Sequence, residues 1–212
     1  MKKFNRRSFC KSAFGSTLAA AALGSPALLV RSQSTEANAS KRYSIRLGGP
    51  IFHAPEDPEE LALAHRRLNY RAAYCPNVDL GQRDRIQAIS KAFEKHGVVI
   101  AEVGRWVNLM DADAEKRKAN FKFVTDGLAL AEEIGALCCV DIAGSFNPTS
   151  WFGPHPDNIS PRFFDAAVEN ARKIIDAVKP KRAKFCYEMM GWALPDSPDS
   201  ALKLVQAVLP ST

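Results

Sequence analysis

VVIAEVGRWVNLMDADAEKRKANFKFVTDGLALAEEIGALCCVDIAGS, residues 98–145, places an apolar run on either side of a long amphipathic segment. The first run, residues 98–104, begins with β-branched residues and predicts a buried strand, and residues 136–145 predict a second one. The segment between them, residues 114–135, predicts a long helix that ends at Gly135. A strand, a helix and a strand in this order predict a βαβ unit with parallel strands.

The same alternation runs through the chain from residue 43 onward, with a repeat of roughly 30 to 40 residues that is typical of βα units. We expect strands at residues 43–49, 70–76, 98–104, 136–145 and 183–192, and helices at residues 57–69, 83–97, 114–135, 160–178 and 197–208. This pattern predicts an α/β fold with a parallel sheet, either doubly wound or closed as a (β/α)8 barrel. Neither GxGxxG nor GxxxxGK[ST] follows a strand, so the nucleotide-binding versions lose support. The TIM-barrel type, with about five βα units present, is therefore favoured.

The first 39 residues are typical of an export signal. MKKFNRRSFCK contains the pair Arg6-Arg7, and residues 12–30 are apolar but interrupted by Gly and Pro, before an Ala-Asn-Ala triplet at residues 37–39. The pattern resembles a twin-arginine signal, although Cys10 stands where Leu is commoner. The apolar run is shorter than the about 20 residues that a membrane span requires. We therefore expect a periplasmic or extracytoplasmic protein, with residues 40–212 as a partial barrel domain that has no stable membrane span.

The charge of the chain argues against a nucleic-acid partner. Six of the 29 Lys and Arg residues and one of the 23 acidic residues lie in residues 1–39, so residues 40–212 carry a net charge of +1. Such a chain lacks the single-sign field of a nucleic-acid surface. The four cysteines beyond the signal lack the CxxC spacing of a zinc or redox site, and we expect them to be small buried side chains.

The stretch KFCYEMMGW, residues 184–192, places the carboxylate of Glu188 near the end of a predicted strand. Alternation turns the bulkier apolar side chains toward the outer helices and Glu188 toward the barrel interior. A buried carboxylate requires a cation, a metal or hydrogen-bond donors, so Glu188 either belongs to a functional site or is ion-paired with an interior Lys or Arg. By the same reasoning we expect Asp141 to be an interior residue paired with Lys184, and Glu102 to be a similar residue on the preceding strand.

Several strand-end segments occur in an order that is similar to a known family. They are RLGGPIF, VVIAEVGRW, KRKANFKFVTDGLALAEEIGA, CCVDIAGS, SWFGPHPDNIS and IIDAVKPKRAKFCYEMMGWALPDSPDS. Together they resemble the sugar phosphate isomerase/epimerase group of the xylose isomerase-like TIM barrels, over essentially all of residues 40–212. The resemblance implies a small-molecule sugar or sugar phosphate as substrate and a divalent metal (Mn, Mg, Co or Zn) at the carboxyl face of the barrel. It also implies that Glu188 is both a metal ligand and the base that moves a proton beside the sugar carbonyl.

Further candidates lie just past the predicted strand ends. The candidates for substrate binding are His53, Arg105, Trp106, His155 and Trp192. The histidines are expected on the catalytic face, or else as residues that structure their loops. The tryptophans, together with Trp151, are candidates for an apolar wall against a sugar ring, and packing at the rim is the alternative. Arg105 is a candidate to hold a phosphate or carboxylate, or else a solvated or ion-paired charge.

The predicted units are too few for a closed barrel, which has eight βα units and about 250 residues. The resemblance places the remaining metal ligands on later strands, so the sequence predicts a chain truncated at its C-terminus that offers a single ligand, Glu188. We expect such a chain to retain no catalytic metal, to be inactive by itself and to self-associate through the open edges of its sheet. The alternative function is an exported, non-catalytic carbohydrate-binding barrel module. An endonuclease on the same barrel is disfavoured by the low net charge.

Overall fold

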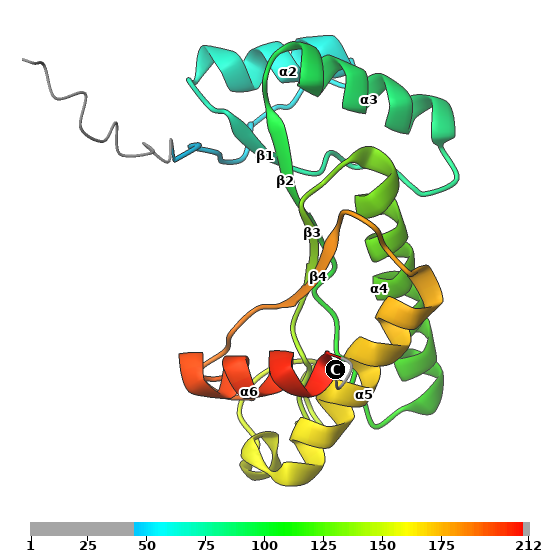
Figure 1. Cartoon of the computed structure of the whole chain (residues 1–212), viewed down its shortest axis with the longest axis vertical. Coiled ribbons are helices and arrows are strands. Elements are labelled where there is room, and N and C mark those ends of the chain that lie inside the picture. Colours follow the sequence, from blue (N-terminus) through cyan, green and yellow to red (C-terminus); the bar gives the residue numbers. More distant parts are fainter. Residues whose placement is uncertain (1–44, 210–212) are drawn as a thin grey trace, which may run out of the picture. The chain divides into compact units, whose positions relative to one another are not determined.

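The computed structural model describes residues 45–209, in which helices and strands alternate along the chain (Figure 1). In order, the elements are α2 (Pro58–Arg67), β1 (Ala72–Tyr74), α3 (Arg83–Lys95), β2 (Val99–Gly104), α4 (Ala114–Ile134), β3 (Cys138–Asp141), the 3-10 helix η1 (Pro156–Ile159), α5 (Pro161–Val178), β4 (Lys184–Tyr187) and α6 (Pro198–Val208). The predicted succession of helices and strands is therefore confirmed for these elements.

The four strands form one parallel sheet in the order β1-β2-β3-β4. Ala72 pairs with Val99, Glu102 with Cys138, and Cys138 with Lys184. Sequential parallel strands that lie side by side, each joined to the next through a helix, are the arrangement of a (β/α)8 barrel. The predicted α/β fold of the partial TIM-barrel type is confirmed.

The predicted strand at residues 43–49 is reduced, in its described part, to a single parallel bridge between Gly48 and Ala72. The N–H of Ala72 donates to the carbonyl of Leu47 at 3.0 Å. Ile45 and Leu47 are 87% and 62% exposed, so this segment buries no apolar face that would extend the pairing. Residues 45–209 therefore contain four strands rather than five.

Three helices begin at the cap residues that the sequence predicts. The side chains of Asp57, Ser160 and Ser197 each accept a backbone N–H from the first turn of α2, α5 and α6, at 2.9, 3.2 and 3.3 Å. A proline follows each cap, at a position where its fixed φ suits a helix and its missing N–H has no intrahelical partner to lose. As predicted, α4 ends at Gly135, whose φ of +83° is left-handed.

One face of the sheet packs against helices, and the other is more open. Consecutive helices pack against one another, and α3 and α4 pack on the strands. Fully buried side chains such as those of Val103, Leu128, Cys139 and Ile174 fill the core between these layers. On the other face, Glu102 is only half-buried. In a complete barrel this second face lines the interior.

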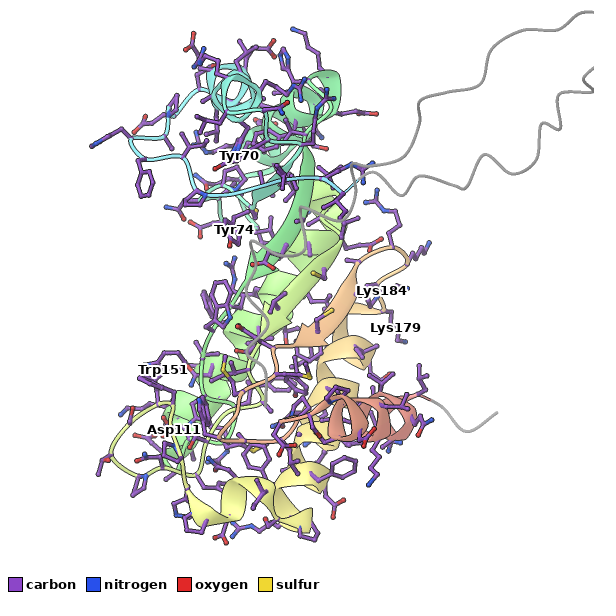
Figure 2. All side chains as sticks on the ribbon, turned by 90° about the vertical axis from the view of Figure 1, so that its left-hand side faces the viewer. Tyr70, Tyr74, Asp111, Trp151, Lys179 and Lys184 are labelled. Carbon is purple, nitrogen blue, oxygen red and sulfur yellow. The ribbon has the colours of Figure 1, made fainter. Side chains whose placement is uncertain are left out.

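The two ends of the strands carry different residues. Figure 2 shows Tyr74, at the end of β1, on the same side as Trp151, which lies in the loop after β3. Lys184, at the start of β4, lies with Lys179 on the other side. Barrels of this type place their chemistry at the carboxyl ends of the strands, which is the side of Tyr74 and Trp151.

The predicted export signal, residues 1–39, lies outside the described residues. Between residues 45 and 209, every helix is too short or too polar to cross a membrane.

Candidate active site

Glu188 lies one residue past the end of β4. Its backbone N–H donates to the carbonyl of Asp141 on β3 at 2.8 Å, which extends the ladder to this position. Its carboxylate accepts a hydrogen bond of 2.7 Å from the indole Nε1 of Trp106. Because both residues are exposed, the carboxylate is accessible to a ligand while the indole holds it in place.

Trp106 reaches Glu188 because Gly104 has no side chain. A Cβ on Gly104, the last residue of β2, would lie 2.2 Å from Cζ3 of the indole ring. The ring therefore occupies the place where a side chain of β2 would stand, and Trp106 remains 43% exposed. Trp106, a predicted rim residue, thus contacts Glu188, the predicted catalytic carboxylate, although the two lie 82 residues apart in the chain.

Glu102 is a second carboxyl group near Glu188, on β2 two residues before Gly104. Burial raises its pKa above the usual value, and the negative charge of Glu188 raises that pKa further. A carboxyl group that keeps its proton to higher pH, on the same sheet as an accessible carboxylate whose charge acts on it, is suited to general acid and base chemistry. Cys138 on β3 is less suited to that chemistry, because burial raises its pKa to about 12.

These carboxylates do not complete a metal site. One oxygen of Glu188 already accepts the Trp106 N–H. Within residues 45–209 no group of three or more His, Cys, Asp or Glu side chains is placed to hold a metal ion. Catalytic zinc sites, for comparison, use three protein ligands. The residues present therefore do not fit a bound catalytic metal, and we assign no step of a reaction to one.

Asp141 is not the interior partner of Lys184 that the sequence predicts. It is fully buried, its Oδ1 accepts the N–H of Val107 at 2.9 Å, and its Oδ2 has no hydrogen-bond partner among the described residues. The register pairs Asp141 with Tyr187, whose side chain turns toward α5, and Lys184 lies three positions earlier on the opposite face. Burial raises the pKa of Asp141 to about 8.

Arg105 follows β2 and runs along α4 instead of standing free on the rim. Its guanidinium lies 4.7 Å from the ring centroid of Phe123, and its Nη1 donates to the carbonyl of Gly104 at 3.1 Å. The side chain is half-buried. Its predicted contact with a phosphate or carboxylate stays a prediction.

The two candidate histidines lie in loops. His53 is exposed and has a left-handed backbone with φ of +55°. His155 caps η1, because its Nδ1 accepts the N–H of Asp157 at 3.2 Å, and its ring packs edge-on against Phe146 with centroids 6.4 Å apart. The described contacts join neither imidazole to Glu188, and their role in substrate binding stays a prediction.

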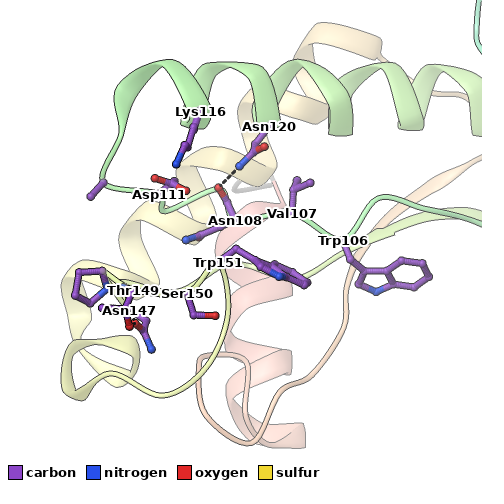
Figure 3. A pocket seen from close by; sticks show the side chains of 12 residues that line it. Trp106, Val107, Asn108, Asp111, Lys116, Asn120, Asn147, Thr149, Ser150 and Trp151 are labelled. Atoms are coloured by element: carbon purple, nitrogen blue, oxygen red, sulfur yellow. Dashed lines mark hydrogen bonds between the residues drawn. The ribbon is translucent and has the colours of Figure 1, made fainter.

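Aromatic side chains border the strand ends. Trp151 packs on Phe152 with ring centroids 4.9 Å apart, and Phe152 lies 6.4 Å from Trp192. Trp151 and Trp106 also line a pocket of about 470 Å³ between the start of α4 and the loop after β3 (Figure 3). The other walls of this pocket carry polar side chains, among them Asp111, Lys116, Asn120, Asn147 and Thr149. Aromatic faces combined with hydrogen-bonding groups suit a sugar.

A buried hydrogen-bond network joins the loops that follow β2, β3 and β4. Oδ1 of Asn108 accepts the N–H groups of Met110 and Ser145, both at 2.9 Å. Nδ2 of Asn158 donates to the hydroxyl of Ser145 at 3.0 Å and to the carbonyl of Trp192 at 3.2 Å. Sequence reasoning missed this network, because an asparagine in a loop gives no signal of whether its side chain points inward.

Comparison with known families gives a match over residues 58–211 to the family described as xylose isomerase-like TIM barrel. The chain therefore belongs to the xylose isomerase-like TIM barrel family. The broader part of the predicted resemblance, to the xylose isomerase-like TIM barrels, is thereby confirmed. No curated protein matches the chain in sequence.

Several solved structures share the fold. A protein described as a xylose isomerase, from Rhodospirillum rubrum, has a TM-score of 0.58 at 16% identity, over 78% of this chain and 62% of that one. D-psicose 3-epimerase from Clostridium cellulolyticum has a TM-score of 0.56 at 15% identity, over 77% and 60%. An L-ribulose 3-epimerase has a TM-score of 0.56 at 14% identity, over 78% and 57%. This chain thus spans 57% to 62% of the length of these three proteins.

Proposed function

We propose that this chain supplies part of the barrel of a sugar isomerase or epimerase, in which Glu188 moves a proton beside the sugar carbonyl. The observation that carries the proposal is the accessible carboxylate of Glu188 at the end of β4, held by Trp106, with the carboxyl group of Glu102 on β2 close enough for the charge of Glu188 to raise its pKa. The names of the similar structures support a sugar substrate, because two of those proteins are sugar 3-epimerases.

Two proton transfers make up the proposed reaction. The carboxylate of Glu188 takes the proton from the carbon beside the carbonyl, and the electrons of the broken C–H bond form the C=C bond of an enediolate. A proton delivered to the opposite face of the same carbon, as the carbonyl forms again, gives the epimer. A proton delivered to the former carbonyl carbon gives the isomer when the proton of the neighbouring hydroxyl also passes to the former carbonyl oxygen. Glu102 is suited to deliver that proton, because its raised pKa keeps it protonated to higher pH than an ordinary glutamate.

The proposed substrate is a sugar or sugar phosphate that packs against Trp106 and the neighbouring aromatic side chains. The divalent metal that the family resemblance implies (Mn, Mg, Co or Zn) would need ligands beyond Glu188 and Glu102. We therefore propose that residues 45–209 by themselves neither retain such a metal nor turn over a sugar.

Exchange of substrate protons with solvent tests the role of Glu188. In the barrel completed by its remaining strands, deuterium from D2O should enter the carbon beside the carbonyl of a ketose, as followed by NMR. Glu188→Gln should slow this exchange by about 100-fold or more, because the amide is neutral and a poor base. Glu133→Gln, which alters an exposed glutamate on α4, is the matched control and should exchange at the wild-type rate. Undiminished exchange in Glu188→Gln would remove Glu188 from the reaction.

A second candidate function is a non-catalytic carbohydrate-binding module. The contiguous aromatic side chains Trp151, Phe152 and Trp192 favour it, because such rings bind sugars without any base. In that case Glu188→Gln would leave the affinity for a sugar unchanged, as measured by calorimetry. Trp151→Ala would weaken that affinity, and a chelator would have no effect.

A further inference from the structure

Arg105 is a partly buried cation without an acidic partner. Its Nη1 donates to the carbonyl of Gly104, whereas its Nε is buried and bonds to no other group within residues 45–209. The ion pairs of that part of the chain do not include it. The cation–π contact between the Arg105 guanidinium and the Phe123 ring offsets part of the cost of burying the guanidinium, but such contacts contribute only about 0.5–2 kcal/mol. The guanidinium thus keeps most of its capacity to donate hydrogen bonds.

The position of this side chain depends on Gly127 of α4. A Cβ on Gly127 would lie 2.4 Å from Cγ of Arg105, so only a glycine lets the stem pass this close to the helix. Glycine inside a helix costs about 1 kcal/mol relative to alanine. The glycine at position 127 of this 21-residue helix therefore leaves the room in which the stem of Arg105 passes α4.

Next to Arg105 lies a pocket of about 250 Å³ at the carboxyl ends of β1 and β2. Its walls are formed by Tyr74, Cys75, Pro76, Asn77, Val78, Gly104, Arg105 and Trp106. The hydroxyl of Tyr74 and the amide of Asn77 add hydrogen-bond donors, and none of the lining residues is an acid. The positive charge of Arg105 acts on this pocket. It lowers the pKa of Cys75, although burial raises that pKa by more. Trp106 lies between this pocket and Glu188.

We propose that this pocket binds the anionic group, a phosphate or a carboxylate, of the substrate, with Arg105 as its main donor. A planar guanidinium binds such groups through paired charge-assisted hydrogen bonds, which would satisfy the unbonded N–H groups. The inference rests on the proposed function, since it places the anionic end of a sugar phosphate or sugar acid beside Trp106 and its reacting end toward Glu188. It narrows the substrate class to sugars that carry a negative charge.

Inorganic phosphate is the first probe, applied to the full chain. Phosphate should raise the thermal unfolding midpoint and bind measurably by calorimetry, whereas chloride at equal ionic strength should do neither. Arg105→Gln should weaken phosphate binding about tenfold or more, and Arg105→Lys should weaken it less. The control is Arg67→Gln, which alters an exposed arginine on α2. Circular dichroism verifies that each variant folds. Phosphate affinity that is unchanged in Arg105→Gln overturns the proposal, as does the absence of any phosphate or acetate binding to the wild type.

Two further measurements distinguish a phosphate from a carboxylate ligand, and this site from the proposed reaction of Glu188. Tighter binding of phosphate than of acetate assigns the pocket to a sugar phosphate, and the reverse order assigns it to a sugar acid. A pentose, its 5-phosphate and the corresponding pentonate that all bind equally would overturn the inference. Glu188→Gln should keep the phosphate affinity, because Glu188 is not among the lining residues. Phosphate binding that depends on Arg105, together with proton exchange that does not depend on Glu188, would refute the proposed reaction and leave this site standing.

Discussion

At the scale of single residues, Asp141 shows how burial changes the chemistry of a carboxyl group. Its pKa is raised to about 8, mainly because the side chain is fully buried between the sheet and the helices. Below pH about 4 the group is protonated in both the folded and the unfolded chain, so the free energy of unfolding does not depend on its titration there and is at its highest for this group. Between about pH 4 and pH 8 the unfolded chain loses the proton and the folded chain keeps it, so stability falls as the pH rises.

Asp141→Asn should remove this dependence on pH. The amide keeps an oxygen for the N–H of Val107 and cannot ionise, so the variant should exceed the wild type in stability at pH 8 by on the order of a few kcal/mol. Urea unfolding at pH 5, 6.5 and 8 measures this difference. Asp176→Asn, at an exposed position of α5, is the control. A stability difference that does not grow with pH would show that Asp141 titrates at an ordinary value.

At the scale of elements, the loops after the strands are held by buried side chains instead of regular structure. Asn158 donates to Ser145, Gly153 and Trp192 and accepts the N–H of Phe146, so one side chain connects two of these loops. The aromatic side chains of the site stand on the same loops. The geometry of the rim therefore depends on residues that do not touch the ligand themselves.

Asn158→Ala should lower the free energy of unfolding by about 2–4 kcal/mol, because it leaves several buried groups without partners. Asn120→Ala removes a single bond, from its Nδ2 to the carbonyl of Asn108, and should cost about 1 kcal/mol. Urea unfolding gives both values. Amide hydrogen exchange at Phe146, whose N–H donates to the Asn158 side chain, should accelerate only in the Asn158 variant. Equal losses in both variants would show that the network does not act as a unit.

At the scale of the whole molecule, the sheet ends at β4 with an unpaired edge within residues 45–209. Lys184 and Glu188 direct their N–H groups to β3, so those of Phe185 and Tyr187 point outward. Beside this edge, Leu202 and Val205 of α6 and its C-cap residue Leu209 are exposed. Open edges next to apolar surface favour pairing with another chain.

We therefore expect the protein to form dimers or larger species at micromolar concentrations. Light scattering coupled to size exclusion measures the molar mass across a dilution series. The double substitution Leu202→Glu and Val205→Lys should shift the protein toward the monomer. Leu68→Lys, at an exposed position at the end of α2, is the control. A monodisperse monomer at every concentration would refute self-association through this surface.

The predicted twin-arginine signal gives the last prediction at this scale. Replacing Arg6 and Arg7 with lysine should keep a fused reporter in the cytoplasm, because recognition of the signal depends on the pair and not on charge alone. Cell fractionation of the double variant measures the distribution, with Lys2→Arg as the control. Normal export of the double variant would mean that residues 1–39 act as a general secretory signal.

Local residue chemistry determined much of this fold from the sequence alone. Asp57, Ser160 and Ser197 begin helices and Gly135 ends one, because capping and a left-handed turn involve only neighbours in the chain. The alternation of apolar runs with helical segments likewise predicted the parallel strands, which the sheet confirms. The resemblance of several strand-end segments pointed to the xylose isomerase-like TIM barrels, which the match over residues 58–211 confirms.

Only the tertiary structure decided how distant residues meet. The bond from Trp106 to Glu188 depends on the positions of β2 and β4 on either side of β3 and on the missing side chain of Gly104. The burial of Asp141 depends on the register of β3, because a shift of one residue moves a side chain to the opposite face. The network around Asn108 and the path of Arg105 past Gly127 likewise join segments far apart in the chain. Such contacts arise from the packing of strands and helices, and no local pattern in the sequence encodes them.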